Sequence, residues 1–141
     1  MKRIAMAAIL GFALTALVSA EGGGPADDPI GAHFFPPDRV MTHSQEIGLE
    51  DTQRATVRAE ILRAQPKFID LQFDMKLESE KLMKLVEEKK VDEARVLAAV
   101  DRILTIEKEI KRTQMILLVR IKNTLTPGQQ AKLEELARNG K

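Results

Sequence analysis

Five side chains in the first half of the sequence carry groups that bind transition metals. They are two imidazoles, a thioether and two carboxylates, at His33, Met41, His43, Glu46 and Glu60. Such groups suit zinc, nickel or copper, but a tight site normally takes four or more ligands. We single out His43, Glu60 and His33, which do not complete such a set. The alternative is that both histidines are solvated in a flexible tail. We expect that no cofactor is required, with Zn, Ni or Cu as the candidates if a metal binds.

The composition argues against an enzyme. The sequence has two His, no Cys and no Tyr, so the usual nucleophiles and proton-transfer groups are scarce. The cluster Gly22–Gly24 lacks the strand and helix that support a phosphate-binding loop. The absence of Cys also excludes thiolate metal sites and disulfides. We therefore expect a protein that binds other molecules rather than one that catalyses a reaction.

The segment 1–20 has the features of a secretory signal peptide. Lys2 and Arg3 precede an apolar run, and Val18-Ser19-Ala20 is a small-residue cleavage site. We expect export to the periplasm; the alternative is an uncleaved N-terminal membrane anchor. Removing Lys2 and Arg3 leaves 20 of the 22 basic residues against 21 acidic ones, a net charge of −1. That balance does not suit a nucleic-acid-binding protein, and no stable membrane span is expected after cleavage.

The mature sequence divides by composition. Gly and Pro dominate 21–40, which predicts a flexible linker, and 41–138 has the pattern of a helical hairpin domain followed by a short tail, 139–141. The pair Phe34-Phe35 interrupts the linker. We expect this pair to dock on the helices of its own chain, or alternatively on a partner.

Two long amphipathic segments make up most of the domain. Apolar residues recur every three or four positions from Val57 to Leu85, and again from Ala99 to Ile121. Pro66 removes a backbone donor within the first segment, so we expect a kink or a break at 64–66. Asp92 is a candidate N-cap for the second segment. The second segment runs from about 92 to 123 and at 1.5 Å per residue is about 48 Å long. One hairpin of this length needs a second hairpin to enclose its core.

Two short motifs mark helix starts. In Leu-Thr-Pro-Gly-Gln, Thr126 is an N-cap, Pro127 suits the first helical position, and Gln129 completes a capping box for a short helix over about 127–138. Leu49 and Gln53 repeat this frame near the front of the domain, with Glu50 at the cap position. Glu is a poor cap, so the alternative is a cap at Asp51. The motif residues are Leu49, Gln53, Leu125, Thr126 and Gln129.

Basic residues gather on both long segments. If the chain folds back on itself, they could form one face mixing cationic and apolar side chains, which would hold unfolded chains through weak, salt-sensitive contacts. The alternative is an ordinary solvated helix surface with ion pairs one turn apart. The residues of this candidate client-binding face are Arg54, Arg58, Arg63, Lys108, Lys111, Arg112 and Arg120.

With its leader, its helical pattern and its two Leu-x-x-x-Gln motifs, the sequence resembles the CpxP/Spy family of periplasmic proteins, which includes ZraP and CnrX. The stretch FFPPDRVMTHSQEIGL is similar to the front of the heavy-metal-resistance branch. The resemblance implies a kinked hairpin that dimerises into a curved four-helix-type cradle. Sensor members also place ligands on the long helix, where this sequence has Leu117 and Ile121, which cannot bind a metal.

Three functions follow as hypotheses. The leading one is an ATP-independent periplasmic chaperone or envelope-stress protein that binds partially unfolded proteins. The first alternative is a periplasmic heavy-metal sensor or resistance protein that binds Zn, Ni or Cu. The second alternative is a structural coiled-coil or membrane-surface helix protein. The expected partners are a second copy of the chain, unfolded or stress-related periplasmic proteins, and a sensor or regulator.

Overall fold

The computed structural model describes residues 29–140, so the predicted signal peptide and the front of the predicted linker lie outside the described residues. The chain divides into two units between His33 and Phe34. Within the first unit, the short 3-10 helix η2 spans Gly31–His33. The second unit contains four α-helices: α1 (Pro37–Thr42), α2 (Asp51–Val86), α3 (Glu93–Thr124) and α4 (Pro127–Arg138). The described residues contain no strand, which confirms the all-α prediction.

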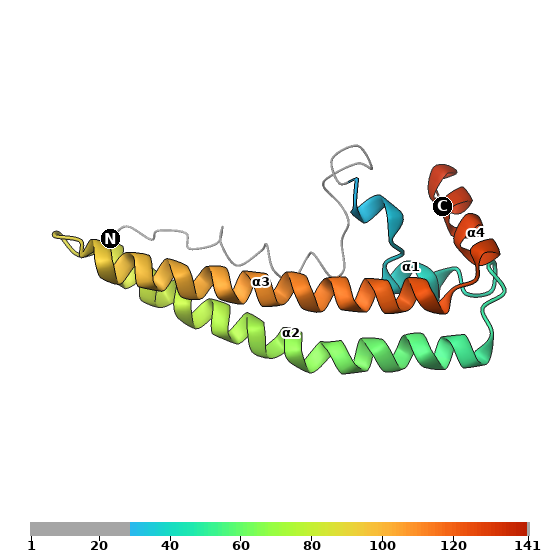
Figure 1. Ribbon diagram of the computed structural model, residues 1–141, viewed down its shortest axis with the longest axis horizontal. Helices are drawn as coiled ribbons and strands as arrows, with labels where there is room; N and C mark the ends of the chain where they lie inside the picture. Colours follow the sequence, from blue (N-terminus) through green and yellow to red (C-terminus); the bar gives the residue numbers. More distant parts are fainter. Residues whose placement is uncertain (1–28, 141) are drawn as a thin grey trace, which may run out of the picture. The chain divides into compact units, whose positions relative to one another are not determined.

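Helices α2 and α3 pack side by side as a long hairpin (Figure 1). Their apolar stripes face each other, and the buried residues of both helices fall on these stripes, including Val57, Phe68, Leu117 and Ile121. Other stripe residues, such as Ile61 and Ile106, are only partly buried. Asp92 caps α3 by accepting a hydrogen bond from the Arg95 amide at 3.1 Å. No helix in the described part of the chain is long and apolar enough to cross a membrane.

Pro66 lies inside α2, which continues unbroken from Asp51 to Val86. The predicted break is therefore wrong. Helix α2 nevertheless changes direction partway along its length (Figure 1). At 100° per residue, Pro66 falls opposite the buried stripe of α2, so the backbone carbonyl that loses its donor lies away from α3. A long helix that curves with its convex side toward solvent tolerates a proline on that side.

The predicted flexible linker, 21–40, does not extend through 34–40. Pro37 begins α1 at a position where its missing N–H is not needed. Phe35 and Val40 are buried, and the Lys122 ammonium of α3 lies 5.6 Å from the ring centre of Phe34 and 6.0 Å from that of Phe35. The two aromatic residues thus dock on their own chain, as expected, and this apolar burial outweighs the proline and glycine content.

Ion pairs join the two long helices along the hairpin. Lys67 on α2 lies 3.1 Å from Glu109 on α3, and Glu78 on α2 lies 2.7 Å from Arg102 on α3. Glu78 also lies 2.6 Å from Lys81. The hydrogen bond from Lys81, followed by that from Arg102, lowers the pKa of Glu78 below its ordinary value of 4.5.

We expect Arg102→Gln to raise the pKa of Glu78 toward its ordinary value, because the charged form loses a donor. A lowered carboxylate pKa contributes stability that is present above the ordinary value of 4.5 and is lost as the pH falls through the lowered value. The variant should lose less stability over that acid range than the wild type. Side-chain carboxyl NMR titration measures the shift. Arg95→Gln, which removes a pair with Glu88, is the control and should leave the pKa of Glu78 unchanged.

Candidate functional site

The open end of the hairpin is closed by a pair of glutamine side chains. Gln53 Nε2 donates to Gln129 Oε1 at 2.8 Å, and Gln129 Nε2 donates to Gln53 Oε1 at 2.8 Å. The two amides thus form a cyclic pair between residues 76 positions apart in the sequence. Gln129 is buried, so each amide group replaces water as the partner of the other.

Each glutamine also caps its own helix and donates a hydrogen bond to a backbone carbonyl next to the other motif. Gln53 Oε1 accepts from the Glu50 amide at 3.0 Å, and Gln129 Oε1 accepts from the Thr126 amide at 2.9 Å. The second N–H of Gln53 donates to the Thr124 carbonyl at 2.9 Å, and that of Gln129 donates to the Gly48 carbonyl at 3.2 Å. All donors and both oxygens of the amide pair are therefore engaged, which fixes α4 against the start of α2.

This arrangement brings the five predicted motif residues together. Thr126 caps α4 by accepting from the Gln129 amide at 3.2 Å, as predicted. Glu50, not Asp51, is the N-cap of α2, so the alternative cap is wrong. Leu49 and Leu125, which precede the two caps, are both buried. The contact between the motifs was not predicted, although a glutamine at the third position of both helices was a signal that could have suggested it.

The candidate ligand His43 lies in the turn that follows α1. Its Nδ1 is 2.8 Å from Glu46 Oε1, and the side chains of His43 and Glu46 are 12% and 50% exposed. Hydrogen bonds from the Ile47 amide to the His43 carbonyl at 3.0 Å and from the Leu49 amide to the Ser44 carbonyl at 2.8 Å hold the turn. In the tautomer that donates from Nδ1 to Glu46, Nε2 of His43 carries the lone pair that a metal can bind.

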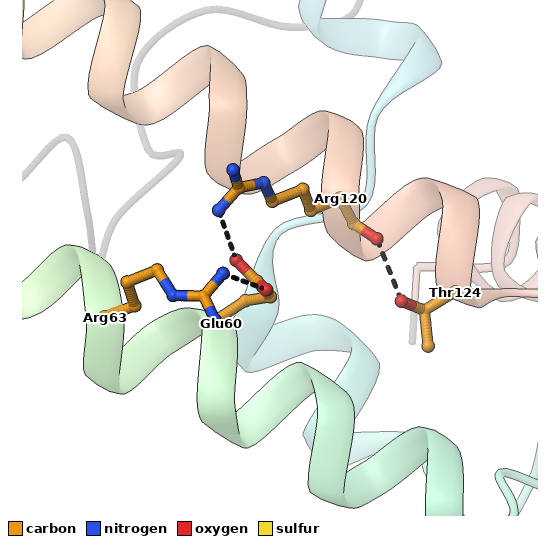
Figure 2. Close-up of polar contacts among 4 residues, drawn as sticks. All are labelled: Glu60, Arg63, Arg120 and Thr124. Carbon is orange, nitrogen blue, oxygen red and sulfur yellow. Dashed lines mark hydrogen bonds and ion pairs between the residues drawn. The ribbon is translucent and has the colours of Figure 1, made fainter.

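The candidate ligand Glu60 is engaged in a cross-helix cluster (Figure 2). Its Oε1 lies 2.8 Å from Arg63 on α2, and its Oε2 lies 2.9 Å from Arg120 on α3. The Glu60 side chain is only 14% exposed. Both carboxylate oxygens therefore bind guanidinium groups rather than pointing to a site with His43. Glu60 acts as a clamp between the two long helices.

The described residues do not assemble a closed metal site. No group of three or more His, Cys, Asp or Glu side chains in 29–140 could hold an ion. His33 ends η2 in the other compact unit. Leu117 and Ile121 of α3 are core residues. Residues of this kind do not fit a tight site of four protein ligands. What remains is the imidazole of His43 with its partner Glu46, and the exposed His33 at the end of η2.

The residues of the predicted basic face lie in different surroundings and have different partners. Glu60 brings together Arg63 and Arg120, while Arg54 pairs with Asp51 at 3.4 Å and Arg112 pairs with Glu109 at 3.7 Å, each on its own helix. Three residues form no ion pair with another described residue and are exposed: Arg58, Lys108 and Lys111. Lys108 and Lys111 fall on the side of α3 opposite its buried stripe.

We expect Gln53→Ala and Gln129→Ala each to destabilise the fold by about 1–3 kcal/mol, because each leaves its partner amide without its hydrogen bonds. The double variant should lose less than the sum of the two, with a coupling of about 0.5–3 kcal/mol. Urea unfolding followed by circular dichroism measures the cycle. Gln65→Ala, on the exposed side of α2, is the control. Additive effects would show that the two amides do not depend on each other.

The family model for heavy-metal resistance matches residues 4–138, nearly the whole chain. No curated protein and no solved structure matched it. The matched span contains the amide pair, both capping motifs and the His43 turn. The chain therefore belongs to the heavy-metal resistance family, the ZraP/CnrX-like branch of the Spy/CpxP superfamily that carries Leu-Thr-x-x-Gln motifs.

Proposed function

We propose that this protein acts in heavy-metal resistance in the periplasm, where it binds metal ions weakly and reversibly without catalysing a reaction. The family, whose members are typically periplasmic, supports this role, as does the signal-peptide pattern of 1–20. The observation that carries the proposal is the pair formed by His43 and Glu46 in the ordered turn after α1.

The pair has the chemistry of a prepared imidazole ligand. A carboxylate that accepts the proton of one ring nitrogen fixes the ring and makes the other nitrogen a better ligand. Glu46 is in position to do this for His43, at 2.8 Å. Backbone hydrogen bonds hold the turn on both sides of the pair. The imidazole is therefore already in place before a metal binds, and little ordering is required on binding.

The same geometry limits the affinity. Glu60 is held by two arginines, and α3 presents Leu117 and Ile121 to the core. One imidazole per chain, completed by water or other donors, gives a low-affinity site that exchanges metal readily. This suits a buffer that moderates metal concentration better than a sensor that must hold one ion tightly.

We expect the purified protein to bind Zn²⁺, Ni²⁺ or Cu²⁺ at about one ion per chain with an affinity weaker than micromolar. His43→Ala should abolish this binding, and Glu46→Gln should weaken it by about 10-fold, because the ring loses the carboxylate that orients it. Isothermal titration calorimetry at neutral pH measures both effects.

Glu60→Gln is the control for this titration. Glu60 is engaged by Arg63 and Arg120, so its substitution should lower stability while leaving the metal affinity unchanged. Binding that survives His43→Ala, or binding that is lost in Glu60→Gln with the fold intact, would contradict the proposed site.

A second role, as a chaperone for partially unfolded proteins, has its own supporting observation on α3. Leu97 and Leu104 are each 54% exposed and Met115 is 40% exposed. At 100° per residue these three share one side of the helix with Lys108 and Lys111. Exposed apolar side chains interleaved with flexible cations suit weak binding of unfolded chains. In this role metal resistance would come from protecting envelope proteins that metals damage.

For this second role we expect the protein to suppress aggregation of a chemically denatured client, and Leu97→Ser/Leu104→Ser to lose most of that effect. The suppression should weaken as the salt concentration rises, because the lysines contribute screened attraction. Light scattering measures it in metal-free buffer. Val86→Ser removes an apolar side chain at the hairpin turn that is 50% exposed and is the matched control. Aggregation that proceeds unchanged with equimolar protein would exclude this role.

A further inference from the structure

The His43 turn ends in a closure that depends on a glycine. The Leu49 amide donates to the Ser44 carbonyl at 2.8 Å, and the Gly48 amide donates to the Gln45 carbonyl at 3.1 Å. These two bonds form a Schellman motif, in which the glycine takes a left-handed conformation. Gly48 does so, with a φ of +64°. Because a side chain is strained in that conformation, the glycine fixes the path of the chain out of the turn.

The carbonyl of this glycine is bound by a side chain of the C-terminal helix. Gln129 Nε2 of α4 donates to the Gly48 carbonyl at 3.2 Å, across 81 positions of the sequence. Gln129 is buried, and its amide is also held by Gln53 and by the Thr126 amide. The donor that reaches the turn is therefore fixed in direction by α4 and by the start of α2.

Buried side chains tie the turn to the same end of the molecule. Ile47 and Leu49, on either side of Gly48, are 7% and 6% exposed. Because both are packed in the core, the turn cannot shift independently of its surroundings. A change in the position of α4 therefore acts, through the Gly48 carbonyl, on the backbone that holds His43 Nδ1 and Glu46 Oε1 at 2.8 Å from each other.

We propose that Gln129 is a positioning residue for the metal site, and that metal binding at His43 is coupled to the docking of α4 against the start of α2. The proposal rests on the metal-binding role of His43 given above. Gln129 does not bind the metal. It acts by holding the Gly48 carbonyl and, through that carbonyl, the turn. Coupling of this kind is reciprocal, so bound metal favours docking by the factor by which docking favours metal binding.

The coupling gives the C-terminal end of the protein a response to metal. A metal on Nε2 of His43 favours the ordered turn, and the ordered turn favours the docked α4. Without metal, α4 undocks in a larger fraction of molecules. Undocking uncovers Leu133 and Leu136, which are 1% and 5% exposed when α4 is docked. The metal concentration thereby controls how often an apolar surface is presented at this end.

Hydrogen exchange of the metal-free protein, followed by NMR, tests the positioning role. We expect the amides of Gly48 and Leu49 to exchange at least about 10-fold faster in Gln129→Ala, measured relative to amides in the middle of α2. Gln130→Ala is the matched control, because the NH2 group of this neighbouring glutamine donates to the carbonyls at the end of α3 rather than to the turn. It should leave the relative exchange rate of the turn unchanged.

Gln129→Glu covers the case in which the alanine variant does not fold. A glutamate keeps an oxygen that accepts from the Thr126 amide and from Gln53, and it suits the third position of α4. An ionised carboxylate cannot donate to the Gly48 carbonyl. The capping box is thus retained while the bond to the turn is lost, so we expect the turn amides to exchange as fast as in Gln129→Ala.

Zinc titration tests the coupling. We expect the Zn²⁺ dissociation constant from calorimetry to rise at least about 5-fold in Gln129→Ala and to stay unchanged in Gln130→Ala. Conversely, saturating Zn²⁺ should slow exchange of the α4 amides, including that of Leu133, by a comparable factor in the wild type and not in His43→Ala. A glutamine that only stabilised the fold would leave zinc without this effect on α4.

The possible failures differ in meaning. Turn exchange that is unchanged in both Gln129 variants would overturn the positioning role. Equal zinc affinity in the wild type and Gln129→Ala, or zinc that does not protect α4, would overturn the coupling while leaving the metal site in place. A wild-type protein that binds no zinc would contradict the proposed function and the coupling with it, whereas the exchange rates of the metal-free protein would still decide whether Gln129 positions the turn.

Discussion

The hydrogen-bonded pair of Gln53 and Gln129 is the contact on which the open end of the molecule depends. The hairpin turn holds α2 and α3 together at one end, but α2 begins and α3 ends at the other, with no covalent connection between them. There the two amides bind each other at 2.8 Å and reach the Thr124 and Gly48 carbonyls. Gly48 closes the turn that begins at His43, so the same pair also positions the candidate metal ligand. An amide suits this task because it offers donors and acceptors without the desolvation cost of a buried charge.

A second constraint is the combination of apolar burial and cross-helix ion pairs along the hairpin. The inner stripe of α2 provides apolar burial but few large side chains that are wholly covered. Ion pairs between the helices flank it, through Glu60 with Arg120, Lys67 with Glu109 and Glu78 with Arg102. Exposed pairs of this type contribute little stability each. Their positions recur along the hairpin, however, and they favour one register of α2 against α3 over its neighbours.

Local rules predicted most of the fold and little of the site. Thr126 and Asp92 act through side-chain contacts within three residues, so their caps followed from the sequence. The meeting of Gln53 with Gln129 joins positions far apart and depends on how the whole hairpin closes. The segment 34–40 was assigned to a linker because Pro and Gly dominate its surroundings, whereas the burial of Phe35 and Val40 depends on α2 and α3 being in place. Glu60 was a plausible ligand by type, and only the fold showed that Arg63 and Arg120 occupy it.

The outer faces of α2 and α3 differ in their chemistry. On α2 the exposed residues Leu62, Ile69 and Phe73 share one side of the helix, with no charged residue among them. On α3 Lys108 and Lys111 interrupt the apolar residues, and burying them against a fixed partner would cost desolvation unless acids faced them. That face instead suits transient contacts with chains that adapt to it. The proposed metal ligand His43 follows α1, whereas the residues of the proposed protein-binding face lie on α3, so substitutions can test the two roles separately.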